Sequence, residues 1–264
     1  LLLGAESTRS KIRELQKEDG IVTIRALESS EKATMLMERY DLVALPVVDE
    51  EQKLVGRITI DDAVDSIIED AERDYQLASG ISEDVESSDD VITLTRARLP
   101  WLLIGLVGGI GGAYVIGWFD IREHAEMALF IPLIAAMGGN VGVQSAAIVV
   151  QGLASSHINT NNLLRRLSKE LGVGILNGLI CGLLILGVTL LLNFGTALSI
   201  TVSIALLCVI VFAALFGTFV PLMLHRYKID PALATGPFIT TVNDIIGLMI
   251  YFAVGSLISG IIPT

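Results

Sequence analysis

The sequence predicts a polytopic all-α membrane domain with five transmembrane helices, preceded by a cytoplasmic α/β module. The first observation is composition, because 52% of the 264 residues are hydrophobic, a high share for a soluble domain. The second is charge: residues 1–100 hold 23 of the 29 acids and 12 of the 18 bases, whereas residues 101–264 hold 6 of each. The third is a series of five long apolar runs after Arg98. An acidic, water-soluble part therefore precedes a membrane part with no net charge.

The α/β module is predicted over residues 21–60. IVTIRAL has the composition of a strand, and SEKATMLMERY has that of an amphipathic helix opened by Ser30. ALPVVDEEQKLVGRITI predicts a hairpin that turns at residues 49–53. A further helix is expected from near Asp61 to about Ala78.

An acidic connecting helix and linker are predicted over residues 61–99. Twelve acids and one base, Arg73, lie between Asp61 and Asp90. The simplest interpretation is a solvated linker, although apolar residues recur on one side of its first part: Val64, Ile67, Ile68 and Ala71. Like charges at this density repel, and salt with a screening length of about 10 Å relieves them only partly. Divalent ions that bridge the acids would let acidic surfaces close.

Five apolar runs are predicted to span a membrane within residues 100–264. They are about Pro100–Phe119, Ala125–Leu153, Leu171–Leu192, Ile200–Leu224 and Gly236–Ile262. Each reaches the roughly 20 residues needed to cross a hydrocarbon core. The glycine-rich stretches, GLVGGIGG in the first run and Gly172 to Gly182 in the third, are interpreted as helix-packing surfaces.

The basic residues between the runs set the predicted orientation. Seven bases lie on the side that holds the N-terminal module: Arg96, Arg98, Arg165, Arg166, Lys169, Arg226 and Lys228. One base, Arg122, lies on the other side. Because bases favour the cytoplasmic side, we expect the module in the cytoplasm and the C-terminus outside, with the protein in the cell (inner) membrane.

The second run carries polar residues near its middle, in PLIAAMGGNVGVQSAA. Asn140 and Gln144 are one turn apart and share a helix face. The glycines are expected to loosen the helix and expose carbonyl groups. Polar backbone at membrane depth is tolerated where protein covers it or where it lines a wet cavity, so this run is predicted to line a pathway.

The fifth run contains Asp244, the one acid placed well inside a predicted span, roughly 12 Å from its cytoplasmic start. Such a residue usually lines a pathway or has a partner. No base lies inside a span, which excludes an ion pair there. One interpretation is a neutral aspartic acid hydrogen-bonded to Asn177 or Gln144. The other is a cation site, for which oxygen ligands favour a hard ion such as Mg²⁺, with Gly247 leaving room beside the carboxylate.

The hairpin and following residues, ALPVVDEEQKLVGRITIDD, resemble the second half of a CBS domain. The nucleotide-binding form of that domain has Gly-x-x-Ser/Thr-x-x-Asp, which matches Gly56, Thr59 and Asp62. The resemblance implies that these residues could hold the ribose of an adenine nucleotide, with ATP as the candidate cofactor. The alternative is a repeat that binds no nucleotide. Residues 1–20 are expected to be a linker and the end of a missing first repeat.

The whole chain resembles the MgtE family of magnesium channels and transporters, most specifically in PLIAAMGGNVGVQSA and DPALATGPFITTVNDIIGLMIYF. The resemblance implies a homodimer whose pore lies at the subunit interface, lined by the second and fifth runs. Asp244 matches the pore carboxylate that holds hydrated Mg²⁺. Thr240 and Gly139 match positions that supply backbone oxygens, and we expect Asn140 to belong to the same pore metal site. Family members often carry Asn where this chain has Val143, and some carry Asn at Gly236.

The same resemblance implies regulation by cytosolic Mg²⁺, which would attach the CBS module to the connecting helix and make that helix plug the pore. The matching acids are Asp62, Asp65, Asp70 and Asp74. Arg73 falls where the family can carry another acid. We therefore expect closure at high internal Mg²⁺ and opening when it falls.

The favoured function is a Mg²⁺-selective, self-regulated channel of the plasma membrane, with the lipid bilayer and a second copy as partners and no nucleic acid. A less selective divalent-cation transporter, accepting Mn²⁺ or Co²⁺, is a second hypothesis. A nucleotide-sensing membrane receptor that transports nothing is a third. An enzyme is not expected, because no nucleophile or acid is arranged around the three histidines and no GxxxxGK phosphate loop occurs.

Overall fold

The computed structural model describes residues 21–82, 84–119, 121–154, 163–234 and 236–259. The predicted linker at residues 1–20 lies outside the described residues. The chain divides into two compact units, residues 1–73 and 74–264, and each is described by itself.

The first unit contains a three-stranded sheet in the order β1-β2-β3. Its elements are β1 (Ile24–Arg25), α1 (Ser30–Tyr40), β2 (Ala44–Val48), β3 (Leu54–Thr59) and the start of α2 (Ile60–Ala78). β1 pairs with β2 in parallel, and β2 pairs with β3 in an antiparallel hairpin. The predicted order of elements is confirmed, although β1 is shorter than IVTIRAL suggested.

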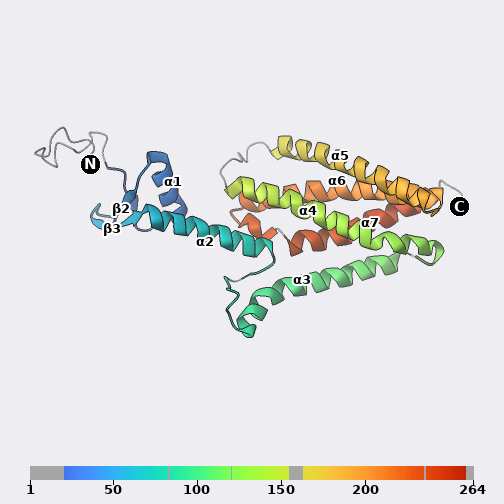
Figure 1. The fold of residues 1–264 in the computed structure, drawn as a ribbon, viewed down its shortest axis with the longest axis horizontal. Helices are drawn as coiled ribbons and strands as arrows, with labels where there is room; N and C mark the ends of the chain where they lie inside the picture. Colours follow the sequence, from blue (N-terminus) through green and yellow to red (C-terminus); the bar gives the residue numbers. More distant parts are fainter. Residues whose placement is uncertain (1–20, 83, 120, 155–162, 235, 260–264) are drawn as a thin grey trace, which may run out of the picture. The chain divides into compact units, whose positions relative to one another are not determined.

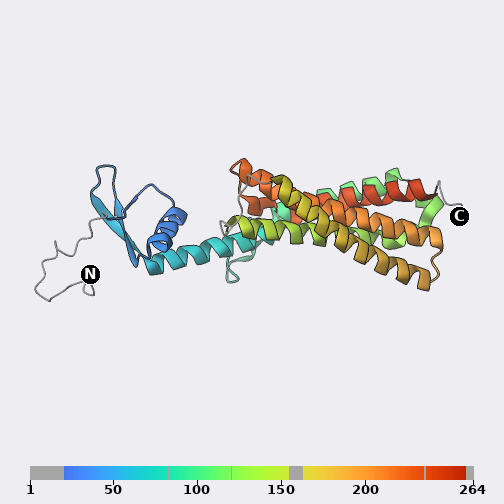
Figure 2. The same cartoon turned by 90° about the horizontal axis from the view of Figure 1, so that it is seen from above.

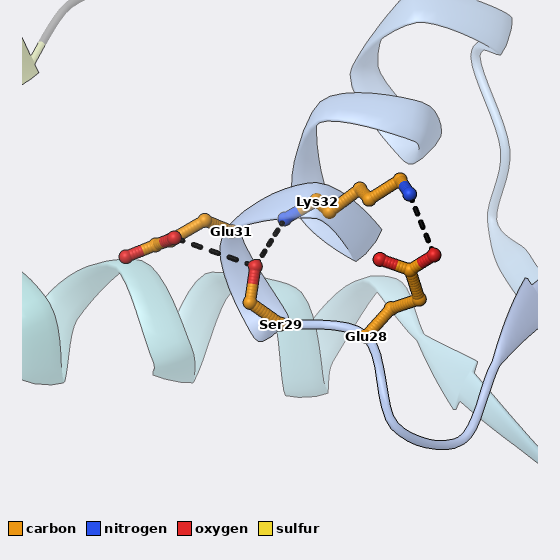
Figure 3. Close-up of polar contacts among 4 residues, drawn as sticks. All are labelled: Glu28, Ser29, Glu31 and Lys32. Carbon is orange, nitrogen blue, oxygen red and sulfur yellow. Dashed lines mark hydrogen bonds and ion pairs between the residues drawn. The ribbon is translucent and has the colours of Figure 1, made fainter.

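The beginning of α1 is held by Ser29, one residue before the predicted Ser30 (Figure 3). The Ser29 hydroxyl accepts a hydrogen bond from the Lys32 backbone N–H at 3.4 Å and donates one to Glu31 Oε2 at 3.4 Å. Lys32 Nζ also pairs with Glu28 Oε1 at 2.7 Å. Adjacent serines offer two candidate caps, and the extended backbone of Ser29 decides between them.

A small apolar core joins the sheet to its helices. It consists of buried residues from β1, α1, β2 and α2: Ile24, Ala33, Met37, Leu45 and Ala63. Ala63 lies in the first turn of α2, so the hairpin and the helix that follows it share one core.

The second unit is a bundle of five long helices (Figures 1 and 2). They are α3 (Val91–Trp118), α4 (Ile131–Ala154), α5 (Leu163–Leu191), α6 (Thr196–Arg226) and α7 (Pro237–Ser259), with short 3₁₀ helices η3 (Ile121–Phe130) and η5 (Pro231–Ala234). All five helices are long enough and apolar enough to cross a membrane, which confirms the five predicted spans.

The first of these helices begins nine residues before the predicted start at Pro100. The Asp90 side chain caps α3 by accepting from the Ile92 N–H at 3.1 Å, and it also accepts from the Thr93 hydroxyl at 2.6 Å. Pro100 therefore lies inside the helix, not at its start. Ser82 donates to the Ala97 carbonyl from both its backbone N–H and its hydroxyl, which fixes the preceding linker to this turn.

Glycines allow the helices to pack closely. Gly174, Gly178 and Gly182 of α5 are buried against α6, where Cβ atoms placed on them would lie 3.1 to 3.2 Å from α6 backbone atoms. Gly111 and Gly112 of α3 face side chains of α7, where Cβ atoms on them would lie 3.0 Å from Ile245 Cδ1 and 3.5 Å from Leu248 Cδ1. The interpretation of these stretches as packing surfaces agrees with this geometry.

The C-terminal half of α7 is joined to the preceding elements by Tyr251. This side chain is fully buried, and its hydroxyl donates to the Met127 carbonyl of η3 at 2.9 Å. The neighbouring Phe252 stacks on Phe119 with ring centroids 5.2 Å apart. A buried hydrogen bond between residues 124 positions apart fixes the position of α7 along the bundle.

Replacing Tyr251 by Phe should lower the stability of the bundle. The change leaves the Met127 carbonyl without this donor, which costs about 1 kcal/mol or more for a buried group. Thermal unfolding in detergent would measure the effect. Tyr114→Phe is the matched control, because Tyr114 of α3 is 80% exposed and should leave the midpoint unchanged. Equal midpoints for both variants would show that the Tyr251 bond does not stabilise the fold.

Candidate ion site and acidic helix

Asp244 is the eighth residue of α7, about 10 Å along the helix from Pro237. Its side chain is half-buried, and within the described residues its carboxylate makes no hydrogen bond or ion pair. If Asp244 were a neutral acid, its expected hydrogen-bond partners would be Asn177 and Gln144. Both are exposed in the single chain, and within the described residues neither is hydrogen-bonded to Asp244. The carboxylate is therefore available to a ligand.

The structure brings Asp244, Thr240 and Gly139 together, as predicted. A Cβ atom placed on Gly139 of α4 would lie 3.8 Å from Asp244 Oδ1 and 3.4 Å from Thr240 Cγ2. The Thr240 hydroxyl donates to the Pro237 carbonyl at 3.0 Å, so it serves the first turn of α7. The absence of a side chain on Gly139 lets the backbone of α4 lie beside the acid.

The predicted loosening of the second span is wrong. α4 is one continuous helix through Gly138, Gly139 and Gly142. These glycines instead admit neighbouring helices, because a Cβ atom on Gly142 would collide with Asn243 of α7, and one on Gly217 of α6 would collide with the Gly142 carbonyl oxygen. Close packing of three helices explains the glycines without unwinding.

The amides of α4 point away from the interior of the chain. Asn140 and Gln144 are both exposed, although Asn140 follows directly after the buried Gly139. Exposed amides at membrane depth are unfavourable against lipid and are normally covered by protein or water. Asn140 and Gln144 thus form an exposed polar face of α4, and among the described residues Asn140 makes no hydrogen bond to Asp244.

Asn243 is a site residue that the sequence interpretation missed. It is 1% exposed, and its Nδ2 donates to the Gly138 carbonyl of α4 at 3.2 Å. It lies one turn after the fully buried Ile239, so the helical spacing of the apolar residues could have identified it as a buried amide. The sequence interpretation concentrated on the neighbouring Asp244 and did not assign a role to Asn243.

A second missed contact joins α4 to α5. The Ser145 hydroxyl, 5% exposed, donates to Glu170 Oε1 at 2.6 Å. Glu170 lies inside α5 because that helix begins at Leu163, eight residues before the predicted run. This side-chain contact between two spans helps to hold the C-terminal half of α4 in place.

Two glycines near the site have roles other than those expected. Gly247 packs against α6, because a Cβ atom on it would lie 3.4 Å from Val209 Cγ1; the predicted room beside the carboxylate stays a prediction. Gly236 has a φ of +59°, and a side chain there would collide with the Ala78 carbonyl oxygen. This close approach explains why glycine stands at this position.

The nucleotide motif forms a capping box at the start of α2. The Thr59 backbone N–H and hydroxyl both donate to Asp62 Oδ2, at 2.7 and 2.6 Å, and the Asp62 N–H donates back to the Thr59 hydroxyl at 3.4 Å. The Thr and Asp of the motif therefore have a structural role, which is to cap the N-terminus of α2. Gly56 of β3 has open space around it. The nucleotide site stays a prediction.

A cavity of about 280 Å³ lies elsewhere in this unit. Its lining residues come from the β1–α1 connection and the end of β2: Arg25, Ala26, Leu27, Glu28, Val48, Asp49 and Glu50. Val48 pairs with Leu54, whereas Thr59 pairs with Ala44 at the opposite end of the hairpin. The cavity therefore does not coincide with the motif.

The four predicted regulatory acids all lie on α2. Asp62 and Asp65 are exposed, and Asp70 pairs with Arg73 at 3.7 Å on the surface. In the part of the chain that is described, no three acidic, histidine or cysteine side chains gather as metal ligands. An ion bound to α2 would have to complete its ligands with water or with another surface.

Comparisons with known proteins match both units. Residues 131–254 match the MgtE family, described as a divalent cation transporter, and residues 12–69 match the CBS domain. The predicted fold class is thereby confirmed, and the five apolar helices together with the transporter domain describe a multi-pass membrane protein.

Three curated relatives carry the name magnesium transporter MgtE. They come from Bacillus subtilis (34% identity over 89% of this chain), Enterococcus faecalis (32% over 90%) and Thermus thermophilus (32% over 95%). The matches cover 53%, 52% and 56% of those proteins, so this chain spans about half their length.

The capping box predicts a specific pH dependence. The Thr59 hydroxyl, followed by its backbone N–H, holds the pKa of Asp62 below its ordinary value. A carboxylate with a lowered folded pKa stabilises the fold above its unfolded pKa, and this contribution is lost as pH falls through the folded pKa. Thr59→Val should raise the pKa of Asp62 and flatten the loss of thermal stability as the pH falls below about 4. Thr34→Val, which removes a hydroxyl bonded to the Ser30 carbonyl, should keep the original slope.

Proposed function

Because this chain belongs by its membrane domain to the MgtE family, we propose that it carries Mg²⁺ across the membrane through a pore built around Asp244. The observation that carries the proposal is a half-buried carboxylate inside an apolar helix with no bonded partner in the described residues. A charge in this position is unfavourable unless water or a cation reaches it. The function is transport and not catalysis.

The chemistry around Asp244 suits a hydrated hard cation. Gly139 of α4 lies beside the carboxylate, and Thr240 faces the same glycine. The proposed ligands are the backbone oxygens of these two residues and the amide oxygen of Asn140, which follows Gly139 in the sequence. Mg²⁺ gives up its waters reluctantly and is often bound by one or two carboxylates and several waters. A single acid with backbone oxygens and an amide at its side fits recognition through the water shell.

The proposed assembly is a homodimer with the pore at the interface of α4 and α7. The exposed Asn140 and Gln144 support it, because a second subunit and a water-filled path would cover amides that lipid would leave unpaired. Two-fold symmetry would place two copies of Asp244 along one path. The orientation follows the bases, with the N-terminal module in the cytoplasm and the C-terminus outside.

Cytosolic Mg²⁺ is proposed to close the pore by binding the acids of α2. Asp62, Asp65, Asp70 and Asp74 supply the charge, and Mg²⁺ would bridge them to a second acidic surface of the assembly. The Arg73–Asp70 pair is exposed and contributes little, so it would compete only weakly with an ion. Closure at high internal Mg²⁺ would make the transport self-limiting.

A less selective divalent-cation pathway is the second candidate. Val143 favours it, because this half-buried side chain of α4 is apolar and offers no polar group to an ion or to its waters. Loss of a polar group near the path would weaken discrimination between Mg²⁺ and ions such as Mn²⁺ or Co²⁺. Competition between these ions in liposome uptake separates the two candidates.

Asp244→Asn should reduce Mg²⁺ uptake into proteoliposomes by about tenfold or more, since losing one charged contact worth about 1.4 kcal/mol already has that effect. The substitution keeps size and removes charge. Asp41→Asn is the matched control, because Asp41 lies in the left-handed C-cap of α1, where Asn fits equally well. Undiminished uptake by a folded Asp244→Asn protein would contradict transport and favour a receptor.

Removing acids from α2 should weaken closure. In the double variant Asp65→Asn, Asp70→Asn, a higher internal Mg²⁺ concentration should be needed to stop uptake, whereas Glu38→Gln on the exposed face of α1 should behave as the unchanged protein. Cleavage by trypsin after Arg73 gives a second readout of access to α2. If millimolar Mg²⁺ alters neither uptake nor cleavage of the unchanged protein, the sensor does not exist.

A further inference from the structure

The buried amide of Asn243 forms the central polar contact between α4 and α7. Its Nδ2 donates to the Gly138 carbonyl at 3.2 Å, and a carbonyl can only accept, so the orientation of the amide is fixed. Gly138 O is also the acceptor of the α4 ladder for the N–H four residues on. The Gly138 carbonyl thus accepts two hydrogen bonds, one within α4 and one from the Asn243 side chain of α7.

The fit around this amide is close on every described side. A Cβ atom on Gly142 would collide with Asn243 Nδ2 and would lie 2.7 Å from Ile239 Cγ2. A Cβ atom on Gly138 would lie 3.9 Å from Asn243 Cβ and 3.1 Å from Val209 Cγ1 of α6. Glycines on α4 therefore receive the amide, and α7 has little freedom to rotate about its axis.

The second atom of the amide has no partner. Asn243 Oδ1 is buried and accepts no hydrogen bond in the described structure. A buried acceptor without a donor lowers stability, and an apolar residue of similar shape would avoid that loss. Stability alone therefore does not account for an amide here, whereas a directional contact that sets the rotation of the helix does.

Rotation of α7 matters because Asp244 is the next residue. Successive residues of a helix point about 100° apart, so the contact that fixes Asn243 against Gly138 also fixes where Asp244 lies beside Gly139. Thr240 shares that second face, 3.4 Å from the Cβ position of Gly139. A turn of α7 would change the separation between the carboxylate and the α4 backbone.

We propose that Asn243 is a positioning residue that sets the ion preference of the pathway, by holding Asp244 at a fixed separation from the α4 backbone. The inference rests on the proposed transport function and deepens it. The separation decides how large an ion, with its waters, is accepted between the two helices. Asn243 does not touch the ion itself.

The test compares ion preference, which a purely structural role would not change. In the full-length protein reconstituted in liposomes, the Mn²⁺ or Ca²⁺ concentration that halves Mg²⁺ uptake is measured for Asn243→Leu and Gly142→Ala. We expect both to shift that concentration by about threefold or more, because small displacements in a positioned site have large effects. Asn177→Leu, an exposed amide of α5, should leave it unchanged.

The outcomes separate this inference from the proposed function. If Asn243→Leu and Gly142→Ala fold but keep the original half-inhibitory concentrations, or lose uptake of all ions equally, Asn243 does not set ion preference. If Asn243→Leu fails to fold, Asn243→Ala and Gly142→Ala decide in the same way. Absence of Mg²⁺ uptake by the unchanged protein would instead overturn the transport function, whatever the variants do.

Discussion

The contact between α4 and α7 is the constraint on which the candidate site depends. Glycines at Gly138, Gly139 and Gly142 remove the side chains that would keep the two helices apart. Asn243 then joins them with a hydrogen bond in the bundle interior. Because the helices touch at this level, the α4 backbone at Gly139 lies beside the Asp244 carboxylate.

That carboxylate has an energetic cost, which is the main reason to regard it as functional. A charged residue in the centre of a span costs about 2.5–3.5 kcal/mol on insertion scales. Tyr251 and Glu170 show how this chain treats other polar groups in its spans, since each is bonded to a neighbouring element. Asp244 has no such bond in the described residues, and the exposed amides of α4 lie on an adjacent face. Water and a hydrated cation are the partners that this arrangement accommodates.

The sequence predicted those features that periodicity and length control. Five apolar runs, the hairpin turning at residues 49–53 and α2 all follow from local patterns, and the structure has them. It misplaced the start of α3 because Pro100 resembles a helix start, whereas the cap at Asp90 lies in the acidic linker. It also treated the glycines of α4 as points of unwinding, because the choice between unwinding and packing depends on helices far away in sequence.

The roles of individual polar residues were the least predictable. Asn243 contacts Gly138 across 105 residues, and Ser145 meets Glu170 across two helices, so no local pattern reveals either pair. Thr59 and Asp62 illustrate the opposite problem, because one short motif fits both a nucleotide site and a capping box. Asp244, Thr240 and Gly139 were predictable together only through a family resemblance, and the structure brings them side by side.

The most direct measurement is the position of a divalent ion in the assembled protein, obtained from the anomalous X-ray scattering of Mn²⁺ in crystals. An ion site at Asp244 predicts a peak beside this carboxylate, next to the α4 backbone at Gly139, that disappears in Asp244→Asn. A map without density there, in which the Asp244 side chain is bonded to another residue or faces lipid, would contradict it.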